Sequence, residues 1–361
     1  MRTQDHTQDD LFCAKTLEEL VPAEHRLRKL RPLVDEAMRP VRGKLGQLYS
    51  HTGRPGIAPE RLLRALLLQV LYGVRSERRL MEELDCHMAW RWFVGLSLNE
   101  EAWDVTVFTK NRERFLEGDI AQQWMAAVVR MLRQRGLVDE EHFSVDATLL
   151  GAQASEQSYQ PKPDPPAEGQ GSGRRGELLK RDTHVCQTDP DAQLYRKSKR
   201  TAFQLAYLGH VVMENRHGLI VAAAATKVST GERRGARALL EKLGRRMRVK
   251  TVGADGAYNE RDFVEALRER HITAHVPSYV RAKRKDWVEP GLRQSQAYQT
   301  SQRIRKRIES CFGWLKDIGN QRRTRFRGEA RVSWAFTFAS AVLNLVRLTG
   351  LEKLQRLEST A

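Results

Sequence analysis

The spacing of hydrophobic residues changes near residue 138, and this change constrains the fold more than any other feature of the chain. Before it, apolar residues recur at helical spacing; segment 59–72, for example, begins with proline and is rich in helix formers. After it, short runs of apolar and β-branched residues alternate with helical segments. We therefore predict an all-α N-terminal domain followed by an α/β domain.

The second domain is predicted to contain five strands in the order β-β-β-α-β-α-β-α, with one more helix at the end. Residues 215–218, Asn-Arg-His-Gly, are a hairpin signal between its second and third strands. Three antiparallel strands followed by alternating helices and strands form the ribonuclease-H-like fold, a mixed five-stranded sheet flanked by helices. The predicted strands are 142–146, 202–214, 219–226, 249–254 and 272–276, and the predicted helices are 230–247, 260–270, 301–316 and 329–348.

Several residues mark the ends of elements and domains. Two helices between Pro59 and Asp85 fit either a DNA-reading helix-turn-helix or an ordinary helical hairpin, and the sequence leaves both open. The predicted helix boundaries are a cap at Ser76, a capping box at Ser97 and Glu100, a cap at Asp119 and an end at Gly136. The predicted domains are a helical DNA-binding domain (1–138), a catalytic domain (139–350) with a flexible Pro- and Gly-rich loop (156–180), and a C-terminal tail (351–361).

The 361 residues carry a formal net charge of +17, which indicates a polyanionic partner, most simply double-stranded DNA. A basic protein without such a partner is the alternative. The charge is uneven, because residues 281–327 hold 14 Lys or Arg against 4 Asp or Glu. The four cysteines form no CxxC pair, which argues against a zinc ribbon. We expect no membrane span, since apolar stretches such as 334–346 carry polar residues.

Asp146, Asp255 and Glu309 are the candidate catalytic and metal-binding residues. Asp146 closes the strand predicted at 142–146, and Asp255 follows the strand predicted at 249–254. If these strands are neighbours, their C-terminal ends bring two carboxylates together, and carboxylate oxygens suit Mg²⁺ or Mn²⁺. Taken alone, either aspartate is more often a helix cap or a turn residue.

Glu309 lies in a strongly basic predicted helix. At about 100° per residue, Arg305, Glu309 and Lys316 fall within one stripe about 40° wide. An adjacent stripe is apolar, so this helix can bury one face while Glu309 faces the metal ions and the two cations flank it to hold DNA phosphates. The alternative is an Arg–Glu pair on a solvated helix face, and the position after two strand-end aspartates favours the site.

At these residues the chain resembles bacterial insertion-sequence transposases of the Asp-Asp-Glu (DDE) class, and the resemblance covers nearly the whole length. Arg305, Glu309 and Lys316 have the spacing of that family's signature: Arg, three residues, Glu, six residues, Lys. The signature often begins with tyrosine where this chain has Gln302, and Tyr298 lies one turn earlier. The other similar segments are 53–55, 66–72, 75–80, 92–96, 144–148, 188–192, 207–210 and 254–258.

The resemblance implies an enzyme in which Asp146, Asp255 and Glu309 hold two Mg²⁺ ions, with Mn²⁺ as a substitute, and which cleaves and joins DNA. It also implies binding of transposon ends and target DNA, a dimer on DNA, no small-molecule substrate, and a cytoplasmic, nucleoid-associated location in bacteria. A non-transposing nuclease of the same fold and a catalytically inactive or co-opted DNA-binding protein are the alternatives. The predicted DNA contacts are Tyr298, Arg303, Arg305, Lys306, Lys316, Arg322 and Arg323.

Overall fold

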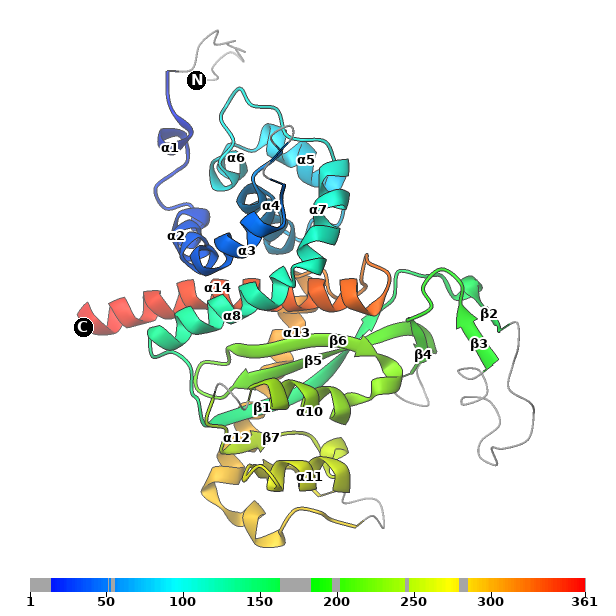
Figure 1. Ribbon diagram of the computed structural model, residues 1–361. Coiled ribbons are helices and arrows are strands. Elements are labelled where there is room, and N and C mark those ends of the chain that lie inside the picture. The colour runs from blue at the N-terminus through cyan, green and yellow to red at the C-terminus, as the bar shows by residue number, and fades with distance from the viewer. Residues whose placement is uncertain are drawn as a thin grey trace, which may run out of the picture.

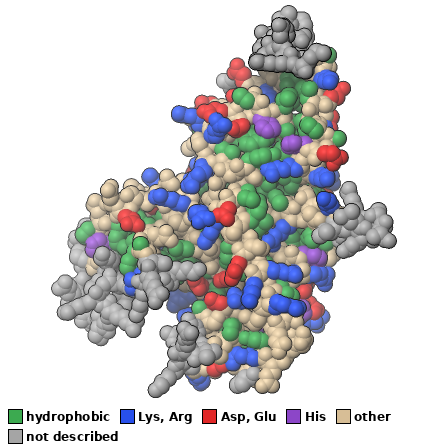
Figure 2. Space-filling model, turned by 180° about the vertical axis from the view of Figure 1, so that it is seen from behind, with side chains coloured by type: hydrophobic (Ala, Val, Ile, Leu, Met, Phe, Trp, Pro, Cys, Tyr) green, Lys and Arg blue, Asp and Glu red, His purple; other side chains and the backbone are tan. Residues whose placement is uncertain are grey.

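A long helix near the C-terminus separates two layers of the molecule: the N-terminal helices lie on one side of it and a sheet with its covering helices on the other (Figure 1). In the rear view, Lys and Arg side chains are spread over both halves, with Asp and Glu among them (Figure 2). The segment 53–55 and most of the predicted loop 156–180, from residue 163 onward, lie outside the described residues. The computed structural model describes residues 14–50, 52, 56–162, 183–196, 202–243, 247–278 and 285–360.

The N-terminal region contains only helices and turns within its described residues, as predicted. Ser76 caps a helix as predicted, because its hydroxyl accepts the backbone N–H of Arg79 at 3.4 Å. The capping box at Ser97 is wrong as a helix start: Glu100 accepts the Ser97 N–H at 3.3 Å, but only a turn follows. The helices are α1 (Leu17–Leu20), α2 (Arg26–Met38), η1 (Arg39–Val41), α3 (Arg42–Gln47), α4 (Pro59–Leu71), α5 (Glu77–Cys86), α6 (Met88–Val94), α7 (Thr106–Glu117) and α8 (Ile120–Gln134).

The helix α8 has the predicted extent but not the predicted cap. Asp119 precedes it in the left-handed region, with φ of 51°, and its side chain makes no capping hydrogen bond. Gly136 follows the helix with φ of 67°, a conformation that glycine adopts without strain. Trp124 of α8 is buried and packs on Phe338 of the C-terminal helix, with ring centroids 6.3 Å apart.

The sheet has the predicted mixed arrangement, in the order β6-β5-β1-β7-β8. β1 pairs antiparallel with β5, and β5 with β6, whereas β1, β7 and β8 run parallel. A sixth strand, β4, pairs with the start of β5, and the hairpin β2–β3 stands apart; these three short strands were not predicted. The strands are β1 (His142–Gly151), β2 (Tyr159–Pro161), β3 (His184–Cys186), β4 (Gln193–Tyr195), β5 (Gln204–Glu214), β6 (Ile220–Lys227), β7 (Thr251–Gly253) and β8 (Thr273–His275).

The strand β1 is longer than predicted, and Asp146 lies at its centre rather than at its end. The pairing with β5 continues past Asp146, which lies opposite Val211, to Gly151 opposite Ala206. Alanine and leucine follow Asp146 and favour strands only weakly. Pairing with a buried neighbour determines their conformation here, because context outweighs intrinsic strand preference.

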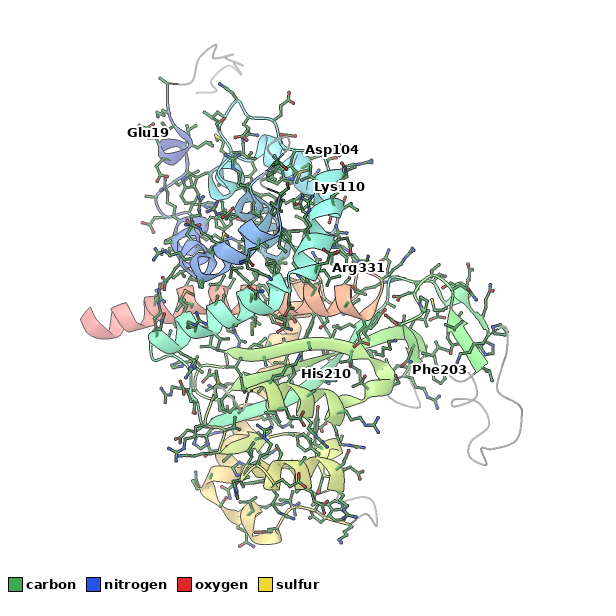
Figure 3. The ribbon with its side chains drawn as sticks, viewed as in Figure 1. Glu19, Asp104, Lys110, Phe203, His210 and Arg331 are labelled. Carbon is green, nitrogen blue, oxygen red and sulfur yellow. The ribbon has the colours of Figure 1, made fainter. Side chains whose placement is uncertain are left out.

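The helices α10 (Glu232–Leu243) and α14 (Glu329–Thr360) cover opposite faces of the sheet. A Cβ atom at Gly235 of α10 would come within 2.2 Å of the His210 ring, and one at Gly209 within 2.7 Å of Phe336 on α14. Because Gly209 and His210 are consecutive on β5, they face opposite sides of the sheet. His210 is buried beneath α10, where burial lowers its pKa to about 4 (Figure 3).

The helix α14 joins the two halves of the molecule. It packs on β6 and on α8, and the buried apolar core is continuous from the N-terminal helices into the sheet region. Contrary to our expectation, the segment Glu329–Lys353 is long and apolar enough to cross a membrane, but 78 % of its most apolar window is buried inside the protein. Residues 351–360 continue this helix rather than forming a separate tail.

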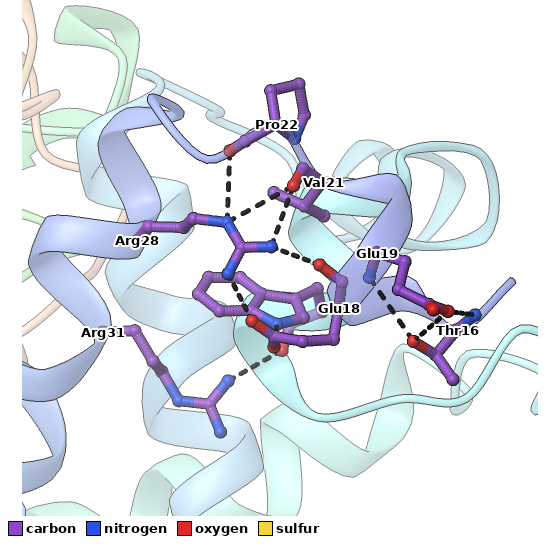
Figure 4. Close-up of polar contacts among 8 residues, drawn as sticks. Thr16, Glu18, Glu19, Val21, Pro22, Arg28 and Arg31 are labelled. Atoms are coloured by element: carbon purple, nitrogen blue, oxygen red, sulfur yellow. Dashed lines mark hydrogen bonds and ion pairs between the residues drawn. The ribbon is translucent and has the colours of Figure 1, made fainter.

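Arginines of the N-terminal region are held in ion pairs. Arg28 pairs with Glu18, and Arg31 with Asp35 at 3.0 Å. The Arg28 guanidinium also donates to the backbone carbonyls of Val21 and Pro22 (Figure 4). The guanidinium carbons of Arg28 and Arg31 lie 5.1 and 5.7 Å from the ring centroid of Trp92, within the range of a cation–π contact. These positive charges therefore stabilise the fold of the helical region.

Candidate active site

Asp146 occupies a partly buried position on β1. Its Oδ1 accepts the backbone N–H of Ala147 at 2.8 Å, and its side chain is 20 % exposed. Burial is the main cause that raises the pKa of Asp146 to about 6, and the charges of Asp255 and Glu309 add to this effect. The Ala147 N–H and the charge of Arg305 oppose it. The raised pKa therefore reflects burial first and the two neighbouring acids second.

Asp255 follows β7 and lies beside Asp146. β1 and β7 pair in parallel as far as Ser144 and Gly253, and Asp255, two residues after β7 ends, is close enough for its charge to raise the pKa of Asp146. Asp255 Oδ1 accepts the N–H of Ala257 at 2.9 Å and so caps the short helix η4 (Gly256–Tyr258). Asp255 is thus both the turn residue and the candidate ligand that the sequence suggested.

Glu309 lies on the second of the two helices that occupy the place of the single helix predicted at 301–316. The single helix predicted at 301–316 is wrong: α12 (Gln296–Arg305) ends before Lys306, and α13 (Arg307–Asp317) begins after it. Glu309 and Lys316 still share one face of α13, whereas Arg305 is the last residue of α12. Glu309 lies exposed in the first turn of α13, close enough for its charge to raise the pKa of Asp146.

Arg305 lies beside Asp146 rather than on an open DNA-facing surface. Its Nη1 is 3.9 Å from Asp146 Oδ2, and the two side chains are 16 % and 20 % exposed. This separation is too long for a hydrogen bond. Arg305 Nε is buried and has no hydrogen-bond partner among the described residues. The guanidinium is therefore loosely held, with donors left over for another anion.

The aspartate pair suits a divalent cation, but the set of three carboxylates is not assembled. Each aspartate has one oxygen fixed by a backbone N–H, at 2.8 Å and 2.9 Å, which leaves its second oxygen for a ligand. Hard oxygen donors of this kind fit Mg²⁺ or Mn²⁺. Within the described part of the chain, no three His, Cys, Asp or Glu side chains lie close enough together to share one ion.

The helix α12 is tied to the sheet by Gln302, at the position where related sequences often have tyrosine. Gln302 Nε2 donates to the backbone carbonyls of His275 and, at 3.3 Å, of Ala254. Tyr298, one turn earlier, is only 9 % exposed, and its ring packs edge-on against His275 with centroids 5.7 Å apart. This burial does not fit the predicted DNA contact of Tyr298.

The other predicted DNA contacts differ in their surroundings. Arg303 and Lys306 are exposed, and Lys316 is partly exposed. Arg322 pairs with an acid at the end of α13. Arg323 donates from Nε and Nη2 to two backbone carbonyls that follow β1, at 2.9 and 3.3 Å. Among the described residues, Arg303 and Lys306 are therefore the exposed cations of this group with neither a carboxylate nor a carbonyl partner.

Residues 319–328, which we call the junction loop, were not singled out as a unit by the sequence. Arg325 of this loop donates to Gln69 Oε1 on α4 at 2.5 Å and lies 3.9 Å from Glu77 on α5. Arg112 of α7 pairs with the same glutamate, and the Phe326 ring lies between both guanidinium groups, 4.9 and 4.8 Å away. Because Arg325 and Gln69 are 256 positions apart in the chain, no local sequence pattern predicts their contact.

Two of the segments that resemble the transposase family, 188–192 and 207–210, hold α14 in place and are not part of the site. Asp189 Oδ1 accepts the N–H of Gly328 at 3.1 Å, and Asp191 Oδ2 accepts the N–H of Glu329 at 2.9 Å. Tyr207 donates its hydroxyl proton to Asp189 Oδ1 at 2.6 Å. These acids satisfy backbone donors at the start of α14, as expected at a helix N-terminus.

The mixed sheet, its strand order and the acidic residues on two neighbouring strands define a class of protein, the ribonuclease-H-like enzymes of phosphoryl transfer. Residues 138–345 match the family described as Transposase DDE domain, and residues 15–114 match Transposase domain (DUF772). The chain belongs to the DDE transposase family, whose enzymes catalyse phosphoryl transfer and typically use divalent metal ions.

Comparison with solved structures gives two further transposases. One is a piggyBac transposase synaptic complex with hairpin DNA, at 8 % identity, 91 % coverage of this chain, 75 % coverage of that chain and a TM-score of 0.41. The other is a pre-cleavage Mos1 transpososome, at 11 % identity, with coverages of 84 % and 82 % and a TM-score of 0.20. No curated protein sequence matches this chain.

Proposed function

We propose that this chain is a DNA transposase that binds the inverted-repeat ends of an insertion sequence and catalyses metal-dependent strand cleavage and strand transfer. The supporting observation is the position of Asp146 and Asp255 on neighbouring parallel strands of a DDE transposase domain. Their mutual repulsion contributes to the raised pKa of Asp146, and a divalent cation between them would relieve it.

In this proposal Asp146 and Asp255 would bridge or share two Mg²⁺ ions and Glu309 would hold the second, with Mn²⁺ as a substitute. Such ions, when bound, neutralise charge at the scissile phosphate and acidify the attacking hydroxyl group. The break at Lys306 separates α12 from α13, so the start of α13 can move toward the aspartates while Gln302 keeps α12 on the sheet.

Arg305 has a second role in the proposal. In the metal-free protein it partly neutralises Asp146 from 3.9 Å. Once a cation takes that place, its guanidinium is released to hold a DNA phosphate, for which a planar group with several donors is well suited. Strand transfer joins two transposon ends to one target, so the active form is proposed to be a dimer on double-stranded DNA.

The central test uses a duplex that carries the inverted repeats flanking the gene of this protein. We expect Asp146→Ala, Asp255→Ala and Glu309→Ala each to abolish Mg²⁺-dependent cleavage, because each removes a ligand, while binding of the same duplex persists in a gel-shift assay. Asp317→Ala, which removes an exposed acid from the same helix as Glu309, is the control and should cleave normally. Full cleavage by any of the three variants would remove that residue from the site.

Two other functions remain to be separated by experiment. A nuclease of the same fold would cleave but would not join pre-cut ends to target DNA, so a strand-transfer assay with pre-cut ends distinguishes it. An inactive DNA-binding protein would show no Mg²⁺-dependent nicking at all. The intact set of Asp146, Asp255 and Glu309 favours an active enzyme over a decayed copy.

A further inference from the structure

Tyr258 is a fully buried residue next to the candidate site. It ends the short helix η4, which Asp255 caps, and its backbone N–H donates to the Asp255 carbonyl at 3.1 Å. Its side chain has no exposed surface, and its ring lies edge-on to Phe263 with centroids 5.1 Å apart. The aromatic ring is therefore held firmly, and its position is linked to that of Asp255.

The hydroxyl group of Tyr258 has no hydrogen-bond partner among the described residues. Burying such a group without a partner costs about 1–3 kcal/mol. Phenylalanine would fill the same space without this cost, so packing does not explain the hydroxyl group. Tyr207, which is the other tyrosine without exposed surface among the described residues, shows the usual arrangement, because its hydroxyl donates to Asp189 at 2.6 Å.

The charges of three acids act on the Tyr258 side chain. Burial raises the pKa of Tyr258 well above its usual value, and the charges of Asp146, Glu232 and Asp255 raise it further, while Arg233 lowers it. The hydroxyl therefore keeps its proton and remains a donor. Asp146 Oδ2 makes no hydrogen bond with Arg305, its nearest cation at 3.9 Å, and is available to accept one.

We propose that Tyr258 is a positioning residue whose hydroxyl donates a hydrogen bond to the Asp146 carboxylate when that carboxylate turns to bind a divalent cation. This inference rests on the proposed function, in which Asp146 is a metal ligand. A donor on the outer side of a ligating carboxylate fixes its orientation, and removal of such a partner typically weakens metal binding about 10- to 100-fold.

The test compares Mn²⁺ binding to the full chain without DNA, measured from the electron paramagnetic resonance signal of free Mn²⁺, with the midpoint of urea unfolding without metal. We expect Tyr258→Phe to weaken Mn²⁺ binding about tenfold and to leave the urea midpoint unchanged or higher. Tyr207→Phe is the matched control, since it removes a partnered hydroxyl far from the site. It should lower the urea midpoint and leave Mn²⁺ binding unchanged.

Two results would overturn the inference. One is a Tyr258→Phe variant that binds Mn²⁺ like the wild type. The other is a Tyr258→Phe variant whose loss of Mn²⁺ affinity is only proportional to its lowered urea midpoint, because that result would indicate a structural role. Asp146→Asn separates this failure from failure of the proposed function. If Asp146→Asn loses Mn²⁺ binding and Tyr258→Phe does not, only the role of Tyr258 is wrong; if neither loses it, the metal site itself is misplaced.

Discussion

Glu77 at the junction of the two layers and Asp146 in the candidate site are similarly buried acids in opposite surroundings. Their side chains are 14 % and 20 % exposed. Glu77 forms a direct ion pair with Arg112, and Arg325 lies 3.9 Å from Glu77. Asp146 has a single cation, also 3.9 Å away, and two further acids that raise its pKa.

This difference separates charges that hold the fold from charges that serve chemistry. At the junction, positive and negative groups complement each other. Removing one of them leaves its partners buried without a compensating charge. In the site, Asp146 is partly buried beside two other acids, and its nearest cation is beyond hydrogen-bond distance, so a cation from outside would relieve the repulsion. The total charge of the chain does not reveal which region binds DNA, whereas the pairing of each charged group does.

The largest expected effect is at the junction. Glu77→Gln should lower the free energy of unfolding by about 3 kcal/mol, because it leaves two guanidinium groups without their carboxylate. Urea unfolding at pH 7 measures this change. Glu82→Gln, on the same helix but with a 55 % exposed side chain paired to Arg79, is the control and should change the free energy by less than about 0.5 kcal/mol. Equal effects of the two variants would contradict the comparison.

In the site, removing an acid should raise the free energy of unfolding rather than lower it. The pKa of Asp146 in the folded protein, about 6, lies above its ordinary value of 3.8, so the folded state loses stability as pH rises from about 4 through 6. Asp146→Asn removes this penalty and should raise the free energy of unfolding by about 2–3 kcal/mol at pH 8, without metal, and by nothing at pH 3.5.

Urea unfolding at both pH values checks the sign, and added Mn²⁺ extends the test. The metal should stabilise the wild type and not the variant, so that the order of stabilities reverses at high Mn²⁺ concentration. An Asp146→Asn variant that is less stable than the wild type at pH 8 would place this carboxylate among the groups that hold the fold.

The smallest effects concern DNA binding. Arg303→Ala and Lys306→Ala should each reduce the slope of log affinity against log salt concentration by about 0.9, because each removes one phosphate contact. Arg135, which forms two hydrogen bonds of 2.8 Å with Glu36, is the matched control from the helical region. Arg135→Ala should leave the slope unchanged, and a loss of slope there would show that paired arginines also contact DNA.

The sequence predicts the strands and their order well, because alternating and apolar runs are local signals that each element carries itself. The strand β1 was predicted too short because its second half has weak intrinsic preference and is fixed by pairing with β5. The short strands β2, β3 and β4, of three residues each, are too brief for a clear pattern.

The sequence predicts which acids belong to the candidate site. It predicts less well how the helices around them are arranged. Asp146 and Asp255 follow from strand positions and a family-like spacing. The break between α12 and α13 at Lys306 was missed because segment 301–306 contains neither glycine nor proline. The contacts of Gln302 with β7 and β8 depend on the tertiary packing of distant segments, which one sequence does not reveal.

The position of α14 between the two layers has a consequence for biosynthesis. Trp124 of α8, in the first half of the chain, is covered by Phe338, near its end. As the nascent polypeptide leaves the ribosome, the early helices carry an apolar surface whose natural cover has not yet been translated. We expect this surface to recruit chaperones until α14 has been translated, and a messenger truncated before α14 to give an aggregating product rather than a free helical module.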